Sequence, residues 1–328
     1  MTPRRIGSLE VPPVGLGCMN LSMGYGPVDG VDAGALLNEA LDLGCTFLDT
    51  ATMYGGGANE ALIGRTVGHR RDEIVLASKC GLSAAGVDGR PETLAAEIDR
   101  SLARLGTDRV ELYYLHRPDP AVPIEDSVGA MARMVEAGKV REIGLSEVST
   151  ATLRRAAAVA PIAAVQSEYS LWSRTPERGV LNACEEIGAT FVPFSPLGRQ
   201  FLTGHASDAT GLAEGDLRTT IARPRFEPEA FRRNSALLEP FGRVAERVGC
   251  TRAQLALAWL LALRGGTLVP IPGTKHVDWL RENVAAAEVR LDADTVAELD
   301  RLIDESTVVG TRYTAERMAE SEAERDPR

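Results

Sequence analysis

The 328-residue sequence predicts an α/β fold in which parallel strands and helices alternate and close into a (β/α)8 TIM barrel. Short runs rich in Val, Ile, Leu and aromatic residues alternate about eight times with longer amphipathic stretches. Several short runs are apolar throughout, as expected for parallel strands covered on both faces. The alternation also fits a doubly wound sheet, but the Gly-x-Gly-x-x-Gly turn that follows the first strand of a Rossmann fold is missing.

The strands are predicted in chain order from these apolar runs. Before the barrel, 4–6 and 9–11 flank Gly7-Ser8 and predict a small β-hairpin within residues 1–12. The barrel strands are expected where the apolar runs fall, at 14–17, 46–50, 74–78, 110–116, 141–146, 163–168, 190–195 and 267–272.

Helices are predicted between and after the strands, with extra helices near the C-terminus. Pro91 fits the first position of one helix, and Gly106 fits the left-handed cap after its end. Periodicity predicts the other helices at 35–43, 124–136, 152–159, 179–187, 236–248, 253–263, 279–287 and 295–303. The segment 198–234 has little periodicity, which is typical of a functional lid or of disorder. We expect the charged tail, 312–328, to fray into solvent.

Length and composition favour a single globular domain over residues 1–328, because this length lies within the range of one α/β barrel with insertions. The chain is 44% hydrophobic and 25% charged, with a net charge of −10 that argues against nucleic acid or anionic membrane as a partner. Five scattered cysteines make a poor disulfide framework, and no ligand spacing indicates a metal. No apolar signal segment or membrane-spanning run is present, so we expect a cytoplasmic protein. Monomer and homo-oligomer both remain open.

Polar residues close three consecutive predicted strands. Asp49, with Tyr54 just beyond it, follows the second strand, Lys79 the third and His116 the fourth. In such a barrel the chemistry lies at the carboxyl ends of the strands, where these side chains would converge. Lys79 beside Asp49 would lower the pKa of Tyr54 and make it a general acid, and His116 would hydrogen-bond a polarised carbonyl oxygen. Each residue alone has a plainer interpretation, as a solvated rim or packing residue.

At this point the sequence resembles the aldo-keto reductase superfamily, from about Arg5 to about Ile303. It is similar to the bacterial, fungal and plant members that carry Gly-Leu-Ser-Glu after the fifth strand. The motifs that carry the resemblance are FLDTATMYGGGANEALIGR (47–65), IVLASKCG (74–81), LYYLHRPD (112–119), REIGLSEVS (141–149), VQSEYSLWSR (165–174), FVPFSPLGRQFLTG (191–204) and VPIPGTKHVDWLRENVAA (269–286).

The resemblance implies a reductase of aldehydes or ketones that uses NADPH. The family's catalytic tetrad falls on Asp49, Tyr54, Lys79 and His116. It implies hydride transfer from nicotinamide C4 to the carbonyl carbon while Tyr54 protonates the oxygen. The resemblance also implies cofactor contacts at Gly17, Cys18, Met19, Asp49, Ser146, Glu147, Gln166, Phe194, Ser195, Pro196, Leu197, Gly198, Arg199, Gln200, Thr274, Lys275, Glu282 and Asn283.

Some positions depart from the family pattern or stay open. Glu147 stands where many members have Asn, Gln200 where Gly is common, and Trp279 where a polar residue usually clasps the adenosine. Arg225 is a candidate to reach over the pyrophosphate from the long loop. Three further residues, Met23, Tyr25 and Trp172, are candidate walls of the substrate pocket, although packing is an equal possibility.

Two other functions compete with the reductase. Channel β subunits in the superfamily bind NADPH with little turnover and report redox state to a partner, and the intact tetrad favours an enzyme over this. A metal-dependent barrel hydrolase would need more ligands than Asp49 and His116.

The resemblance places Lys275 at the adenosine 2′-phosphate, where a dianion requires a cation. We therefore expect Lys275→Ala to weaken NADPH binding far more than NADH binding, measured by titration of each cofactor. Equal losses for the two cofactors would remove Lys275 from this role.

Overall fold

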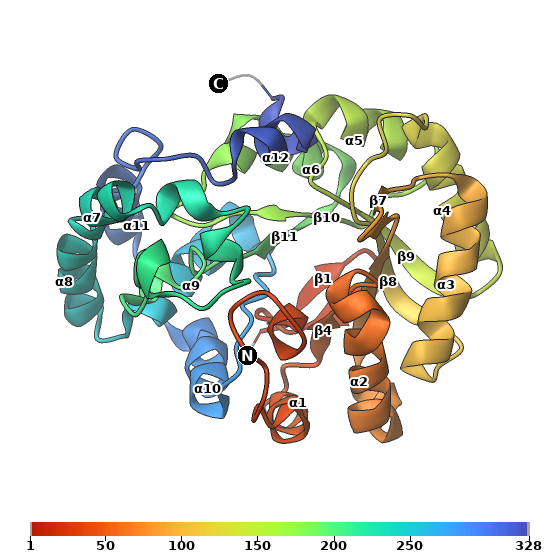
Figure 1. Ribbon diagram of the computed structural model, residues 1–328, viewed down its shortest axis with the longest axis horizontal. Coiled ribbons are helices and arrows are strands. Elements are labelled where there is room, and N and C mark those ends of the chain that lie inside the picture. The colour runs from red at the N-terminus through yellow and green to blue at the C-terminus, as the bar shows by residue number, and fades with distance from the viewer. Residues whose placement is uncertain (1, 327–328) are drawn as a thin grey trace.

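The computed structural model describes residues 2–326 and confirms the barrel (Figure 1). Within these residues seven parallel strands form one sheet in the order β11-β10-β9-β8-β5-β4-β3. Neighbours in the ring are therefore consecutive along the chain, as βαβ units require. The barrel strands are β3 (Leu16–Gly17), β4 (Phe47–Asp49), β5 (Val75–Cys80), β8 (Val110–Leu115), β9 (Val140–Ser146), β10 (Ala164–Glu168) and β11 (Thr190–Phe194).

The segment 267–272 completes the ring without forming the regular strand predicted there. On one side the amides of Val269 and Ile271 donate to Phe191 and Pro193 of β11, at 3.0 and 3.1 Å. On the other side the amides of Gly15 and Gly17 donate to the carbonyls of Pro270 and Pro272. Proline has no N–H to return these bonds, so the pairing with β3 is one-sided. The prediction of a regular strand is therefore wrong, although the segment occupies its place.

Helices surround the sheet and follow the predicted order. Each amphipathic helix buries one face against the strands. Thr251 and Gln254 form a capping box at the start of α9. The helices are α1 (Ala33–Asp42), α2 (Ala58–Val67), α3 (Pro91–Leu105), α4 (Ile124–Glu136), α5 (Thr150–Ala157), α6 (Val180–Ile187), α7 (Pro228–Ser235), α8 (Leu238–Val248), α9 (Arg252–Ala262), α10 (Val277–Ala285), α11 (Ala293–Leu302) and α12 (Ala315–Glu320). Of these, α2, α7 and α12 were missed by the periodicity.

The N-terminal hairpin forms as predicted and fills one end of the barrel. Its strands β1 (Arg4–Ile6) and β2 (Leu9–Val11) pair antiparallel around Gly7-Ser8. Ile6, Leu9 and Val11 are buried and join one apolar cluster with inward-facing barrel residues such as Phe47 and Val192. A second small hairpin, β6 (Leu82–Ser83) with β7 (Gly86–Val87), follows β5. Because the hairpin β1–β2 fills one end of the barrel, a functional site can lie only at the opposite end, where the strands have their carboxyl ends.

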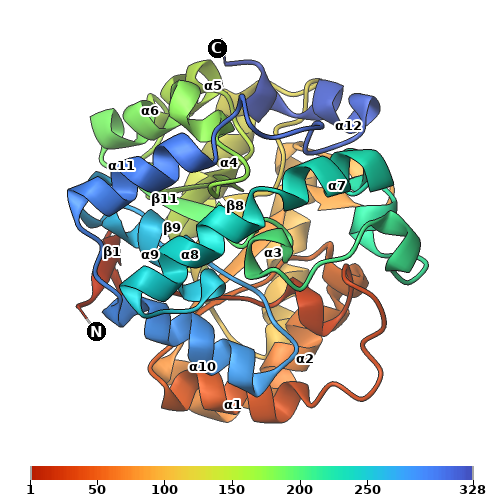
Figure 2. The ribbon, with the colours of Figure 1, turned by 90° about the vertical axis from the view of Figure 1, so that its left-hand side faces the viewer.

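The two segments whose order was in doubt are both folded. Residues 198–234 form four short 3₁₀ turns before entering α7, and Figure 2 shows α7 beside α8 on the outside of the barrel. The expectation that the tail frays is wrong for 312–326, because Arg312, Tyr313, Ser321 and Ala323 are buried. Residues 327 and 328 lie outside the described part of the chain. None of the helices that the structure describes is long and apolar enough to cross a membrane.

The crossing of α2 over the end of α3 depends on Gly64. A Cβ built on Gly64 would lie 2.5 Å from the backbone oxygen of Leu105. We predict that Gly64→Ala lowers the free energy of unfolding by about 1–3 kcal/mol, measured by urea denaturation, because two backbones must separate. The control is Gly129→Ala in α4, where the nearest atom is 3.9 Å away on Arg133. This variant should be neutral or gain up to about 1 kcal/mol. Equal unfolding midpoints for both variants would contradict the prediction.

Candidate active site

The four predicted catalytic side chains meet at the carboxyl ends of β4, β5 and β8. The ammonium of Lys79 donates to the Asp49 carboxylate, to the Thr50 carbonyl at 2.8 Å and to the Tyr54 hydroxyl at 3.3 Å. The rings of Tyr54 and His116 meet edge to face with centroids 5.9 Å apart. Tyr54 begins a 3₁₀ turn, Tyr54–Gly57, just after β4. The polar cluster predicted from the strand ends is therefore present.

Asp49 and Lys79 form an ion pair in the barrel interior, and both are about 1% exposed. Burial alone would lower the pKa of Lys79, but the Asp49 carboxylate and the hydrogen bonds to Asp49 and Tyr54 raise it above its ordinary value. Gln166 of β10 donates to the second Asp49 oxygen at 2.8 Å, so the carboxylate is hydrogen-bonded on both sides. A buried charge needs this pairing. Lys79 therefore stays protonated and fixed beneath Tyr54.

The net direction of the Tyr54 pKa differs from the sequence prediction. Burial of the phenol raises its pKa above 10, and the opposing effect of Lys79 is smaller. The predicted lowering by a neighbouring cation is real, but desolvation of the phenolate outweighs it. Tyr54 is consequently a protonated phenol at neutral pH, with its hydroxyl already in contact with a cation.

His116 is a neutral imidazole in this environment. Burial lowers its pKa well below 6.5, and the positive charges of Arg117 and Lys79 lower it further. Its Nδ1 atom is buried and has no hydrogen-bond partner among the described residues. Arg117, which sequence reasoning missed, lies next in the chain and donates to the Ser146 hydroxyl at 3.2 Å. The site thus offers a neutral imidazole and a guanidinium beside Tyr54.

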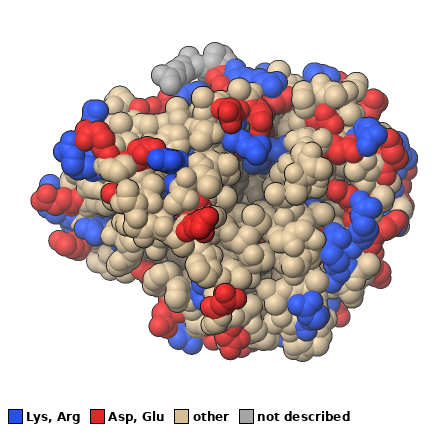
Figure 3. All heavy atoms as spheres, viewed as in Figure 1, with Lys and Arg blue, Asp and Glu red and all other residues tan. Residues whose placement is uncertain are grey.

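These residues open into an elongated cavity of about 1140 Å³. It reaches from Tyr54 and His116 to the first turns of α9 and α10, where Arg252 and Trp279 line it. The molecular surface is hollowed near the middle of the face drawn in Figure 3. Single small-molecule sites commonly measure roughly 300–1,000 Å³, so there is room for a substrate beside a large cofactor.

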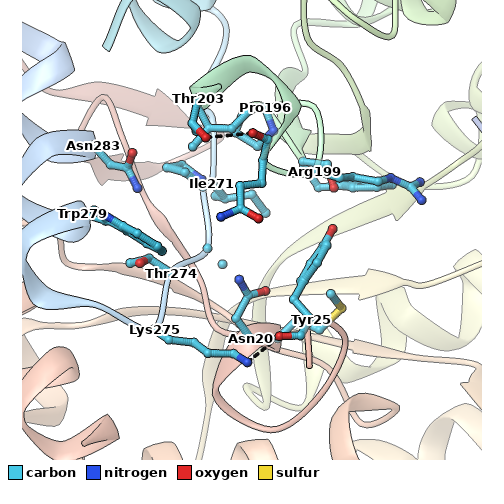
Figure 4. Close-up of a pocket in the computed structure, with 18 of the residues that line it drawn as sticks. Asn20, Tyr25, Pro196, Arg199, Thr203, Ile271, Thr274, Lys275, Trp279 and Asn283 are labelled. Carbon is cyan, nitrogen blue, oxygen red and sulfur yellow. Dashed lines mark hydrogen bonds between the residues drawn. The ribbon is translucent and has the colours of Figure 1, made fainter. Parts of the chain in front are cut away.

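Most of the predicted cofactor residues line this cavity, and Figure 4 shows several of them. They are Gly17, Met19, Asp49, Ser146, Gln166, Phe194, Ser195, Pro196, Leu197, Arg199, Gln200, Thr274, Lys275, Glu282 and Asn283. Cys18 and Gly198 do not line it. Cys18 is fully buried with its thiol on the Leu16 carbonyl, and Gly198 packs on the Trp172 ring. The aromatic Phe194 and the amide and hydroxyl groups nearby fit a nicotinamide nucleotide.

The loop after β11 is held in an unusual backbone conformation. Ser195, Arg199 and Gln200 all have positive φ, between 48° and 78°, which costs roughly 1–3 kcal/mol per residue. Gln200 therefore adopts a left-handed backbone conformation that glycine usually occupies. Its amide oxygen accepts from Arg218 at 2.7 Å, and Arg218 is itself paired with Asp216. The departure from Gly at position 200 thus ties the segment 216–218 to this loop.

Glu147 is a third predicted cofactor residue that does not line the cavity. Its carboxylate is fully buried, does not line the cavity and accepts from Arg312, from Ser321 at 2.9 Å and from the Glu168 amide at 3.1 Å. Arg312 belongs to the tail that was expected to fray. The physical reason is that a carboxylate buried at a strand end requires a cation, and the tail supplies it.

The same charged cluster continues to the cavity wall. Glu168 pairs with Arg199 at 2.6 Å and lies 3.6 Å from Arg312. The Tyr313 ring lies near both guanidinium groups, with its centroid 4.6 Å from the central carbon of Arg199 and 4.7 Å from that of Arg312, and it also lines the cavity. No local signal in the sequence pointed to Tyr313, because its position depends on contacts far along the chain.

Two other candidates are corrected and two are retained. Arg225 does not reach the cavity: its guanidinium donates to the Trp172 and Gly310 carbonyls. Trp172 is not a pocket wall, because its ring is buried and stacked on Phe201 at 4.0 Å. Met23 and Tyr25 do line the cavity, as one of the two interpretations predicted.

Fold and site together define a barrel enzyme with a Lys-Tyr-His cluster beside a nucleotide-sized cavity. The sequence model of the Aldo/keto reductase family matches residues 13–304, and the chain therefore belongs to this family. It is similar to aldo-keto reductase yakc of Schizosaccharomyces pombe, whose name specifies NADP(+), with 45% identity over 94% of each chain.

Solved structures of other proteins share this fold with the chain. One is the glycerol dehydrogenase from Gluconobacter oxydans, with a TM-score of 0.81, 26% identity, and 92% of this chain and 94% of that one covered. Another is an aldo/keto reductase from Klebsiella pneumoniae in complex with NADP and acetate, with a TM-score of 0.71, 27% identity, and coverage of 92% and 95%.

The Glu147–Arg312 pair predicts a specific acid sensitivity. Burial alone would raise the pKa of the Glu147 carboxyl, but Arg312 and Arg117 lower it from 4.5 to about 2. A depressed folded-state pKa contributes stability above pH 4.5 that is lost as pH falls towards 2. We therefore predict that the difference in unfolding free energy between the wild type and Glu147→Gln shrinks by on the order of 3 kcal/mol over this window.

Denaturant unfolding at several pH values measures this difference. The control is Glu239→Gln, because Glu239 forms an exposed pair with Arg243 and should contribute little at any pH. A wild-type to Glu147→Gln difference that stays constant from pH 6 to pH 2 would contradict the assignment.

Proposed function

We propose that this protein is an NADP-dependent reductase of aldehydes or ketones, with Tyr54 as the general acid. The observation that carries the proposal is the contact of the Tyr54 hydroxyl with the Lys79 ammonium at 3.3 Å, beside His116 and at the wall of a large cavity. A protonated phenol that touches a buried cation can donate its proton to a developing alkoxide. The proposal is supported by the family of the chain and by the NADP named for its relatives.

The residues that would hold the cofactor are those that line the cavity from β3 to α10. Ser146 and Gln166 offer hydroxyl and amide groups for the carboxamide, and the Phe194 ring offers a face for the nicotinamide. Bound NADPH supplies the hydride that reduces the carbonyl carbon. The buried unpartnered atoms His116 Nδ1 and Arg252 Nε are further groups of this chain that suit a polar ligand.

The chain's own residues then divide the acid chemistry among them. Tyr54 holds the proton at its hydroxyl, and Lys79 stabilises the phenolate that remains after transfer. Asp49 keeps Lys79 charged and in place. His116 is neutral, so it orients a carbonyl oxygen by hydrogen bonding without competing as an acid. Gln166 fixes the Asp49 carboxylate from the other side.

The substrate in this proposal is a small carbonyl compound. Tyr25, Arg117 and Tyr313 line the cavity together with Tyr54 and His116, and they combine aromatic surface with one cation. This wall suits a carbonyl compound that carries a second polar group. The cytoplasm is the proposed location, in keeping with five cysteines that are all free thiols.

We predict that the wild type oxidises NADPH in a carbonyl-dependent manner and that Tyr54→Phe loses nearly all of this rate while keeping cofactor affinity. Absorbance at the reduced-nicotinamide band with aromatic aldehydes and diketones measures the rate, and calorimetry measures the affinity. Because the pKa of Tyr54 lies above 10, the rate should not fall as pH rises from 6 to 9 through loss of this proton.

The control is Tyr169→Phe, which removes a hydroxyl that donates to Glu177 outside the cavity. Near-normal turnover in Tyr54→Phe would overturn the acid assignment. Tight NADPH binding with no turnover on any carbonyl would favour the redox-reporting subunit instead.

A further inference from the structure

Among residues 2–326, five lysine and arginine side chains line the cavity, and three of them, all arginines, are engaged by neighbouring residues. Arg199 pairs with Glu168, Arg218 with Asp216, and Arg117 donates to the His116 carbonyl and Ser146. The charges of Arg199 and Arg218 are thus neutralised by carboxylates, and Arg117 uses donors on a carbonyl and a hydroxyl at the Tyr54 end of the cavity. The remaining two, Lys275 and Arg252, lie at the end of the cavity formed by the loop before α10 and the first turn of α9.

Lys275 is less available than its sequence position suggests. Its ammonium donates to the carbonyls of Tyr25, Gly26 and Pro27, at 2.6, 3.2 and 2.7 Å, and Figure 4 shows it directed at this loop. An ammonium has three N–H donors, so all three are used. Lys275 therefore joins the loop 25–27 to the segment that follows 267–272. None of its three donors remains for a phosphate.

Arg252 has the opposite character. Its guanidinium lies between the backbones of two glycines, so that a Cβ on Gly242 would be 2.5 Å from Nη2 and one on Gly204 would be 2.7 Å from Nη1. Its Nε atom is buried, and no hydrogen bond or ion pair joins the side chain to any of residues 2–326. A buried unpaired donor on a charged group is costly, and an anionic ligand would relieve that cost.

The surroundings of Arg252 identify which part of a nucleotide lies there. The first turn of α9 contacts α10, where Gln254 donates to the Glu282 carbonyl at 3.3 Å. Trp279 on α10 lines the same part of the cavity and is 42% exposed. An exposed indole in a cavity is a platform for a flat aromatic base. Because Tyr54 and His116 mark the reacting end, the adenosine end lies against α9 and α10.

We propose that Arg252, and not Lys275, binds the 2′-phosphate of NADP and sets the preference for NADP over NAD. The planar guanidinium can donate two parallel hydrogen bonds to a phosphate. Because Gly204 and Gly242 have no side chains, the guanidinium fits closely between their backbones. Lys275 instead shapes the cavity by holding the loop 25–27. This inference rests on the proposed use of NADP.

Calorimetric titration with two fragments tests the inference without any turnover. Adenosine 2′,5′-bisphosphate carries the 2′-phosphate, and adenosine 5′-monophosphate lacks it. The wild type should bind the bisphosphate more tightly, and Arg252→Ala should reduce this ratio of affinities roughly tenfold or more. Arg252→Lys should retain part of the ratio, because it keeps the charge but loses the fork. Lys275→Ala should weaken both fragments by a similar factor, in contrast to the selective loss of NADPH binding that the sequence resemblance implies, because its donors are used on carbonyls.

Two further variants guard against a fold defect. Arg243→Ala removes an exposed arginine of α8 that pairs with Glu239, and it should leave the ratio unchanged. Gly242→Ala keeps the Arg252 charge but displaces the guanidinium, so the ratio should fall while α8 is preserved.

Several results would overturn the inference. Equal losses for the two fragments in Arg252→Ala, or no loss, would do so, as would a ratio that collapses only in Lys275→Ala. A wild type that shows no preference for the bisphosphate would do so as well. A failure of carbonyl reduction would contradict the proposed reaction but would not change these affinities.

Discussion

The ion pair of Asp49 and Lys79 inside the barrel is the interaction on which the site depends. Two opposite charges at adjacent strand ends are tolerable there only because each is paired and hydrogen-bonded, by Thr50 and Tyr54 on one side and Gln166 on the other. The pair keeps a cation within 3.3 Å of a buried phenol. Without that cation, burial would oppose any transfer of the Tyr54 proton.

A second buried group of charges performs a structural task next to the first. Glu147 follows β9 and Glu168 ends β10, and both side chains are buried. Arg312 from the tail and Arg199 from the loop after β11 neutralise them. The tail and the cavity wall are therefore joined through one cluster, and Tyr313 of the tail lines the cavity with both cations near its ring.

The cavity also shows how the number of available cations shapes ligand choice. A guanidinium or ammonium that is already paired has few donors left for an anion, whatever its position along the chain. Lys275 and Arg252 illustrate the two cases, since the first is saturated by carbonyls and the second has no partner among the described residues. The sequence motif placed Lys275 at the α9–α10 end of the cavity. The hydrogen bonds that Lys275 already makes leave it no donor for a phosphate.

The sequence by itself determined the order of the barrel strands and of most helices, the N-terminal hairpin and the convergence of Asp49, Tyr54, Lys79 and His116. These follow from local periodicity and from the rule that parallel strand ends share one rim, which needs no knowledge of distant contacts. Only the tertiary structure decided the rest. Pro270 and Pro272 prevent a regular strand at 267–272 although both neighbouring strands still hydrogen-bond to this segment. The charged tail is held by the Glu147 carboxylate, 165 residues before Arg312. The pKa of Tyr54 depends on its burial, and the contacts of Lys275 depend on carbonyls of the loop 25–27. That Arg252 Nε is buried without a partner depends on how the surrounding elements pack. Such pairings between residues far apart along the chain leave no periodic trace in the sequence.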